Sequence, residues 1–391
     1  MRILIAAASF SVNISGLQRH AFNQAQCMLR AAEVERVDFV VAPWQQEIAR
    51  ASGLEQDAKF ALHVAEMDRS SIARNAWYYR KLPEVARAVH ADLLHLSFPM
   101  PIDASAFRCP TVVSLHDLYP YEIPMNFGFP KFIFNRLALR QCLGAVDSIA
   151  CVSEATKRKL QKYLPRFSRK AVRIYNCVEP HDPQHVLQLE GWNDRPFLLC
   201  VAQHRKNKNL KLLIRAFRQL LEIGAIAAQT RLLIVGIEGP ETRTLHRVIS
   251  QSALEERVHF REGLSEAELQ WCYRNCEALI SPSITEGFGL PVAEALLAGS
   301  RVVCSEITAH WEIGAGRCRF VNLQYDGERK LADAIVASLS EAKQQRVELP
   351  ELSARRITRQ YVDLYRELLS PVPAAPLSEA ISIATSGSRV P

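Results

Sequence analysis

The chain has 391 residues, of which 48% are hydrophobic and 23% charged, with 20 prolines and 16 glycines. That length is ample for two domains, and the balanced composition excludes disordered, collagen-like and fibrous proteins. No apolar run has the length of a transmembrane helix, and residues 1–10 are typical of a first strand rather than of a cleaved signal peptide. We therefore expect a globular, cytoplasmic protein.

The positive charge is unevenly distributed. The formal net charge is 48 − 41 = +7, and residues 1–180 hold all of the excess, with 23 basic and 16 acidic side chains. Residues 131–173 contain 11 basic and 2 acidic side chains. This region is either a solvated basic face or a surface that attracts phosphate-bearing acceptors or an anionic membrane. No basic motif is interleaved with aromatic residues, so we expect no nucleic-acid partner.

The cysteines give no pattern typical of a metal site. Ten are present without a CxxC pair, and the closest two, Cys272 and Cys276, lie one helical turn apart. Cys151, Cys200 and Cys304 stand in apolar runs. We therefore expect buried, reduced thiols and no bound metal.

Strand-like and helix-like segments alternate along the whole chain. Continuous apolar strands separated by helices predict parallel sheets covered on both faces, and hence two doubly wound α/β domains. Ligands in such folds bind beyond the carboxyl ends of the strands, so two facing domains imply a shared cleft. The predicted strands are residues 2–7, 37–42, 92–97, 111–116, 148–152, 172–175, 197–202, 231–235, 257–260, 278–281 and 301–304.

These patterns predict the domain organisation. Residues 1–178 form the first domain, a proline-containing linker spans residues 179–195, and residues 196–353 form the second domain. Residues 354–370 form a final helix that Ser353 is placed to cap, and the Pro-, Ala- and Ser-rich residues 371–391 are expected to be a disordered tail.

Residues 283–299, SITEGFGLPVAEALLAG, carry the strongest local signal. A strand ends just before them, a glycine-containing loop follows, and Pro291 stands where a helix favours proline at its first position. The free backbone N–H groups of such a helix start suit an anion such as a diphosphate. Glu294 has an alternative explanation, because acidic residues are favoured near a helix start. Glu286, beside two glycines at a strand end, is more typical of a group that binds hydroxyls.

A second cluster is cationic. Arg205, Lys206, Lys208 and Lys211 crowd the start of a helix, where the macrodipole makes cations unfavourable. A solvated lysine-rich helix start is an alternative explanation, but a broken local rule is typical of a binding site, and a bound diphosphate would relieve the repulsion. His116, at the carboxyl end of a predicted strand, is either a core histidine or a group that faces the cleft.

Residues 286–295 resemble the EGFGLPxxEA motif of the retaining glycosyltransferases of family 4, which have the GT-B fold of two Rossmann-like domains facing a central cleft. Segments resembling the family's HDL, VSExTK and IYNGV motifs follow in order at residues 116–118, 152–157 and 174–178. The order and spacing of these matches extend the resemblance along nearly the whole chain. The pattern is similar to that of bacterial surface-polysaccharide and mannosyltransferase-like members.

The resemblance implies a role for individual residues. Glu286 and His116 act on the donor sugar, Glu294 binds the ribose, and Lys208 holds the phosphates. The remaining donor-binding positions that it implies are Gly16, Gly287, Phe288, Gly289 and Leu290. The family often has an arginine where this chain has Gln203, and Arg205 is the substitute that we expect.

The resemblance also implies an activity, namely transfer of a sugar from a nucleotide diphosphate sugar to an acceptor hydroxyl with retained configuration. No metal or other cofactor is expected. The first domain would bind a glycan or lipid-linked acceptor at the inner membrane face, and the last helix would cross back to the first domain. Two alternatives remain: a nucleotide-sugar epimerase of the same fold and a non-catalytic nucleotide-sugar-binding protein. We expect Glu286 to be exposed in the cleft, so that Glu286→Ala lowers turnover far more than stability.

Overall fold

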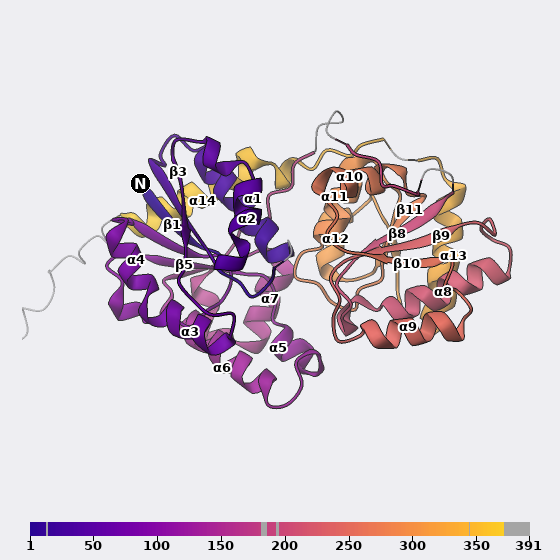
Figure 1. Ribbon diagram of the computed structural model, residues 1–391, viewed down its shortest axis with the longest axis horizontal. Helices are drawn as coiled ribbons and strands as arrows, with labels where there is room; N and C mark the ends of the chain where they lie inside the picture. Colours follow the sequence, from indigo (N-terminus) through magenta and orange to yellow (C-terminus); the bar gives the residue numbers. More distant parts are fainter. Residues whose placement is uncertain (13–14, 181–185, 193–194, 344, 371–391) are drawn as a thin grey trace, which may run out of the picture.

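The computed structural model describes residues 1–12, 15–180, 186–192, 195–343 and 345–370. Two parallel sheets, each flanked by helices, lie side by side in the long direction of the molecule (Figure 1). The predicted tail, residues 371–391, lies outside the described residues, as does part of the predicted linker.

The first sheet has seven strands in the order β3-β2-β1-β4-β5-β6-β7, and all of its pairs are parallel. Its strands are β1 (Arg2–Ala6), β2 (Arg36–Val41), β3 (Phe60–Val64), β4 (Leu93–Leu96), β5 (Thr111–Leu115), β6 (Ser148–Cys151) and β7 (Ala171–Arg173). Its helices are α1 (Gly16–Leu29), α2 (Gln46–Ala51), α3 (Ser71–Arg80), α4 (Leu82–Ala88), α5 (Tyr119–Glu122), α6 (Lys131–Ala145) and α7 (Glu154–Tyr163).

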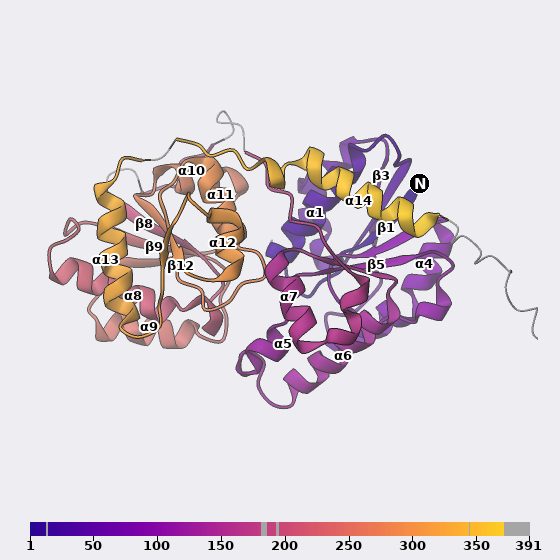
Figure 2. The same ribbon diagram turned by 180° about the vertical axis from the view of Figure 1, so that it is seen from behind.

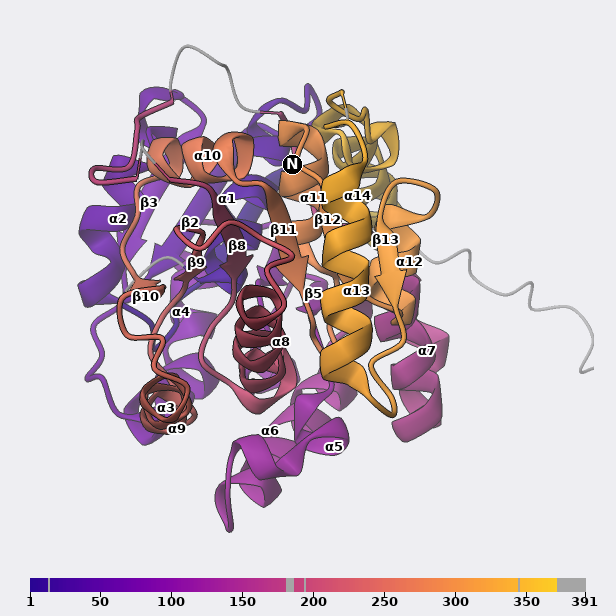
Figure 3. The ribbon, with the colours of Figure 1, turned by 90° about the vertical axis from the view of Figure 1, so that its right-hand side faces the viewer.

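The second sheet has six parallel strands in the order β10-β9-β8-β11-β12-β13 (Figure 3). Its strands are β8 (Phe197–Val201), β9 (Arg231–Val235), β10 (Val258–Arg261), β11 (Ala278–Ser281), β12 (Val302–Ser305) and β13 (Arg319–Val321). Its helices are α8 (Leu210–Glu222), α9 (Thr242–Gln251), α10 (Glu266–Asn275), α11 (Leu290–Ala298), α12 (Thr308–Gly314) and α13 (Gly327–Ser340).

All of the predicted strands occur, and the structure has two further strands that were not predicted. Both missed strands, β3 and β13, lie at an edge of their sheet. The five residues of β3 are partly or fully exposed, and only one of the three residues of β13 is buried. Edge strands lack the continuous apolar run by which buried parallel strands are recognised, so the pattern did not mark them.

The last helix, α14 (Ala354–Leu369), returns across the first domain and packs beside α1 (Figure 2). Its buried face, with Ile357, Tyr361 and Tyr365, belongs to the same hydrophobic core as β1 and β2. Ser353 stands at the N-cap position, but its hydroxyl donates to the carbonyl of Pro350 at 2.7 Å. The predicted side-chain cap is therefore not formed.

Two further features bear on the function. Within the described ranges, no helix is both long and apolar enough to cross a membrane. All ten cysteines are free thiols, and eight of them are buried.

Candidate functional site

The loop after β11 meets the loop after β5 between the two domains. A Cβ atom on Gly287 would lie 1.7 Å from the carbonyl oxygen of His116, so only glycine allows this approach. The carbonyl of Gly287 accepts hydrogen bonds from the hydroxyls of Ser153 and Thr156, the latter at 3.1 Å. Thr156 also donates to the carbonyl of His116 at 3.1 Å. The start of α7 thus fixes the motif loop against the first domain.

Glu286 lies within this contact and is only 8% exposed, so the expectation of an exposed carboxylate is wrong. One of its oxygens accepts from Lys208 Nζ at 2.6 Å and from the Ser283 hydroxyl at 2.6 Å. The other accepts from the Tyr119 hydroxyl of the first domain at 3.3 Å. Burial raises the pKa of Glu286, but the Lys208 charge and the hydrogen bonds outweigh it, and the pKa is lowered overall. The carboxylate is therefore buried and ionised.

The cationic cluster separates into different environments. Lys208 ends a short 3-10 turn, Lys206–Lys208, directly before α8, and its ammonium reaches Glu286. Lys206 is exposed, and Lys211 pairs with Glu241 at 2.7 Å. Arg205 is half-buried and lies close enough to Asp117 of the first domain to lower the pKa of that carboxyl, which burial raises to about 6 overall. Of the four cations in this cluster, Lys208 and Arg205 are thus the two that face the domain interface.

The helix start after the loop keeps its donors available. Gly289 is the N-cap of α11 with φ 105°, and the helix begins at Leu290, so Pro291 occupies the second position rather than the first. Gly299 ends the helix with φ 84°, as predicted. Among the described residues, no hydrogen bond is donated by the amides of Phe288, Gly289 and Leu290. These amides lie at the start of a helix, where an anion is stabilised.

Two other predicted donor-site residues approach the same helix. A Cβ on Gly16, at the start of α1, would be 3.8 Å from the Leu290 side chain. Glu294, in α11, is buried and accepts from the Tyr273 hydroxyl at 2.6 Å and from Arg19 at 3.2 Å. Arg19 belongs to α1, so this ion pair joins the two domains. The structure therefore brings Gly16, Leu290 and Glu294 together.

His116 occupies the carboxyl end of β5 and is half-buried. Its Nε2 lies 2.8 Å from the carbonyl oxygen of Ser97, which can only accept, so Nε2 carries the proton. Burial lowers the pKa of His116 to about 4, so the ring is neutral at pH 7 and its Nδ1 retains a lone pair. His116 is therefore suited to accept a hydrogen bond, not to supply a positive charge.

A buried histidine network beneath this site was not predicted. Ser114 Oγ lies 2.8 Å from Nε2 of both His20 and His95, and His95 Nδ1 lies 2.6 Å from the Tyr365 hydroxyl of α14. His20 also makes an edge contact with the His116 ring, with centroids 4.6 Å apart. Burial lowers the pKa of His95 to about 3. The network thus connects Tyr365 of the last helix, α14, to the His116 ring.

Other interface residues were also missed. Lys159 donates to the Glu286 carbonyl at 2.8 Å and pairs with Glu122 at 2.9 Å. Glu312, from α12, accepts from the Glu154 amide at the start of α7 at 2.8 Å. The spacing of Ser153, Thr156 and Lys159 along one helix face could have signalled this contact, because residues three apart on a helix are neighbours.

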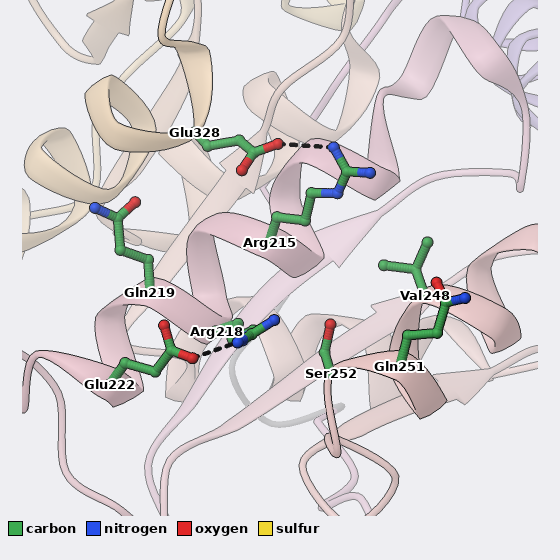
Figure 4. Close-up of a pocket in the computed structure, with 8 residues that line it drawn as sticks. All are labelled: Arg215, Arg218, Gln219, Glu222, Val248, Gln251, Ser252 and Glu328. Atoms are coloured by element: carbon green, nitrogen blue, oxygen red, sulfur yellow. Dashed lines mark hydrogen bonds and ion pairs between the residues drawn. The ribbon is translucent and has the colours of Figure 1, made fainter.

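A surface hollow lined by residues of α8, α9 and α13 has a different character (Figure 4). Its charged side chains pair with each other, Arg215 with Glu328 at 2.9 Å and Arg218 with Glu222 at 2.6 Å. Over the part of the chain that the structure describes, no three His, Cys, Asp or Glu side chains group as metal ligands.

Comparisons with known proteins agree with this architecture. Residues 188–345 match the family "Glycosyl transferases group 1", and residues 14–182 match "Glycosyltransferase Family 4". The structure of HepE from Anabaena, in complex with UDP and glucose, superposes with a TM-score of 0.69 at 18% identity, covering 94% of this chain and 100% of that chain. That likeness shows the fold.

The sequence relatives include several mannosyltransferases. The O-antigen chain mannosyltransferase RfbU of Salmonella typhimurium is 26% identical over 57% of this chain and 59% of its own length. The O-antigen chain mannosyltransferase B of Escherichia coli is 23% identical over 80% of this chain and 84% of its own. A GDP-mannose-dependent phosphatidylinositol monomannoside mannosyltransferase of Mycolicibacterium smegmatis is 34% identical over 42% of this chain and 44% of its own.

These findings support a hexosyltransferase of polysaccharide biosynthesis and give no support to an epimerase. The two family matches, the relatives and the pair of parallel-sheet domains all agree. The chain belongs to glycosyltransferase family 4, the glycosyl transferases group 1, with the GT-B fold.

Proposed function

We propose that the protein transfers a mannosyl residue from GDP-mannose to an acceptor hydroxyl, with retention of configuration and without a metal ion. The proposed donor site rests on one observation: Lys208 and Glu286 pair at 2.6 Å beside the helix-start amides of Phe288 to Leu290. These groups offer a cation and N–H donors to a diphosphate and a carboxylate to sugar hydroxyls. The mannosyltransferase relatives support the sugar, and the GDP-mannose-dependent relative supports the base.

In this proposal each group has one task. Lys208, Arg205 and the amides stabilise the negative charge that develops on the leaving diphosphate, as fixed donors do in a preorganised site. Glu286 holds donor hydroxyls, and Glu294, which Arg19 and Tyr273 orient, binds the ribose. Neutral His116 accepts a hydrogen bond from the donor sugar. No carboxylate is assigned as a nucleophile, so the diphosphate oxygen would take the acceptor proton on the same face.

The acceptor is proposed to be a glycan or lipid-linked saccharide at the inner face of an anionic membrane. The segment from residue 123 to residue 146 contains no acidic residue. Its apolar side chains are unusually exposed, with Phe129 at 81%, Phe134 at 64% and Leu137 at 58%. Lys131 and Arg140 of α6 are exposed beside them. A surface with apolar and basic side chains together suits the interface of an anionic bilayer.

Vesicle flotation tests the membrane part separately. We expect retention on phosphatidylglycerol vesicles, weaker retention on phosphatidylcholine, and loss of retention in Phe129→Ser/Phe134→Ser. The matched control, Ile72→Ser/Tyr79→Ser, removes exposed apolar side chains from α3, 83% and 44% exposed, and should leave retention unchanged. Equal binding to both vesicle types, or an equal loss in the control, contradicts the membrane proposal.

The transfer reaction is tested by incubating GDP-mannose with a panel of saccharide acceptors and determining the anomeric configuration of the product by NMR. The expected result is an α-linked product, formed with EDTA present. Lys208→Gln should abolish transfer, whereas Lys211→Gln, which removes a lysine already paired with Glu241, should retain it. A β-linked product or a requirement for metal contradicts the mechanism. Nucleotide binding without any transfer or donor hydrolysis favours a non-catalytic binding protein.

A further inference from the structure

Arg74 stands on the inward face of α3, at the carboxyl edge of the first sheet. Trp77 and Tyr78 on the same face are buried, and the Tyr78 hydroxyl donates to the Ala8 carbonyl, just after β1, at 3.1 Å. This bond fixes α3 against the loop that follows β1. Arg74, one turn before Tyr78, therefore lies over that loop, with its guanidinium carbon 5.7 Å from the centre of the Phe10 ring.

The Arg74 guanidinium is partly buried and pairs with no acidic side chain in the described part of the chain. Its Nε and Nη1 atoms are inaccessible to solvent and have no hydrogen-bond acceptor among the described residues. Burial lowers the pKa of Arg74, and the one group that opposes this is the Tyr78 side chain rather than a carboxylate. The Phe10 ring provides a cation–π contact but accepts no conventional hydrogen bond. A desolvated guanidinium without an acceptor is costly, which marks a position awaiting an anion.

The position of Arg74 sets it apart from the donor groups. The loop that carries Phe10 leads to Gly16 at the start of α1, which approaches Leu290 of the second domain. Arg74 therefore lies along the same edge as the proposed reaction site, but on the first domain. Phe10 itself is 54% exposed, so the stacked pair lies at the surface, but an anion reaches Nε and Nη1 of Arg74 only when this side chain turns outward. Lys208 and Arg205, by contrast, follow β8 in the second domain.

We propose that Arg74, stacked on Phe10, binds a phosphate group of the acceptor. A guanidinium presents its N–H donors in a planar fork that matches two phosphate oxygens, which a neutral saccharide does not supply. That the bound molecule is an acceptor depends on the proposed transferase function, whereas the presence of a phosphate site at Arg74 does not. The proposal narrows the acceptor class to saccharides that carry a phosphate or diphosphate ester.

Calorimetric titration with inorganic pyrophosphate tests the site without measuring transfer. The titration uses the full chain in a Lys208→Gln background, which removes the principal donor-site cation. We expect Arg74→Gln in that background to weaken pyrophosphate binding by at least about tenfold, and Arg74→Lys to weaken it less, because a lysine keeps the charge but loses the fork. The matched control is Arg80→Gln, which removes an exposed charge from the same helix and should leave binding unchanged.

Three results would overturn the proposal: unchanged pyrophosphate affinity in Arg74→Gln, an equal loss in Arg80→Gln, or a large fall in melting temperature in Arg74→Gln that shows a structural role. Removing an unpaired buried charge should instead leave the melting temperature close to that of the parent. Geranyl diphosphate and mannose 6-phosphate as further probes distinguish a lipid-linked phosphate from a soluble sugar phosphate. If no nucleotide binds the protein, the proposed donor site is contradicted. The pyrophosphate titration of the Arg74 variants still tests the proposed phosphate site, because it does not depend on nucleotide binding.

Discussion

Replacing Glu286 by glutamine tests whether the Lys208–Glu286 pair is shielded from water. The carboxylate accepts from Lys208, Ser283 and Tyr119, and the side chains of Lys208 and Glu286 are 18% and 9% exposed. Removing one partner of a buried pair costs about 3–5 kcal/mol, because the other charge stays desolvated. Lys208 retains some contact with water, so we expect a loss of about 2–3 kcal/mol in the free energy of unfolding.

The assay is equilibrium urea unfolding followed by circular dichroism, with Glu328→Gln as the matched control. Glu328 pairs with Arg215 at 2.9 Å in the surface hollow of Figure 4, but these side chains are 44% and 55% exposed. The control should lose less than about 1 kcal/mol. A nucleoside diphosphate should recover part of the loss in Glu286→Gln, because its phosphates supply Lys208 with a new anionic partner. Equal losses in the two variants would refute the argument that the Glu286 pair is buried.

The other predictions concern acid stability and domain contact. His95 is neutral in the folded state, with its pKa lowered to about 3 by burial, against about 6.5 when unfolded, so the unfolded state binds more protons below pH 6.5. Its contribution to the free energy of unfolding should therefore fall by about 2 kcal/mol between pH 7 and pH 5. In urea titrations, the free energy of unfolding of His95→Gln should decrease correspondingly less than that of the parent over this pH range. An equal decrease in the two proteins contradicts a neutral, buried His95. Gly287→Ala should separate the domains, because its Cβ would lie 1.7 Å from the His116 carbonyl oxygen, and X-ray scattering should detect a larger radius of gyration. Gly144→Ala, whose Cβ would meet Phe167 at an ordinary 3.7 Å, is the control, and equal radii in the two variants contradict the tight contact.

The local sequence pattern was sufficient to predict the buried strands and the end of α11. The buried strands are continuous apolar runs, and Gly299 stands in the left-handed conformation that ends α11. The edge strand β3 escaped prediction because its residues are partly exposed and do not form such a run. Ser353 occupies the cap position, yet its hydroxyl bonds to Pro350, a choice that depends on the preceding turn.

In the candidate site, too, local patterns predicted individual residues but not the contacts between the domains. The motif predicted Glu286 and Glu294, and the cationic helix start predicted Lys208, because each lies in a segment with a recognisable pattern. The local pattern could not reveal that Glu286 is buried, because Tyr119, which contacts its carboxylate, lies 167 positions earlier in the chain. Arg19, Lys159 and Glu312 were missed for the same reason. Each acts on a residue of the other domain, so its partner is defined only when the two sheets are brought together.

The most direct test of the donor site is a thermal-shift panel with GDP, UDP, ADP and dTDP, each with and without magnesium, on the parent protein, Lys208→Gln and Lys211→Gln. A ligand that prefers the folded state raises its stability, by about 2.7 kcal/mol at 100 times its dissociation constant. The account predicts the largest rise in melting temperature with GDP, independent of magnesium, lost in Lys208→Gln and retained in Lys211→Gln. No rise with any nucleotide, or a rise that survives in Lys208→Gln, would contradict a diphosphate site at Lys208.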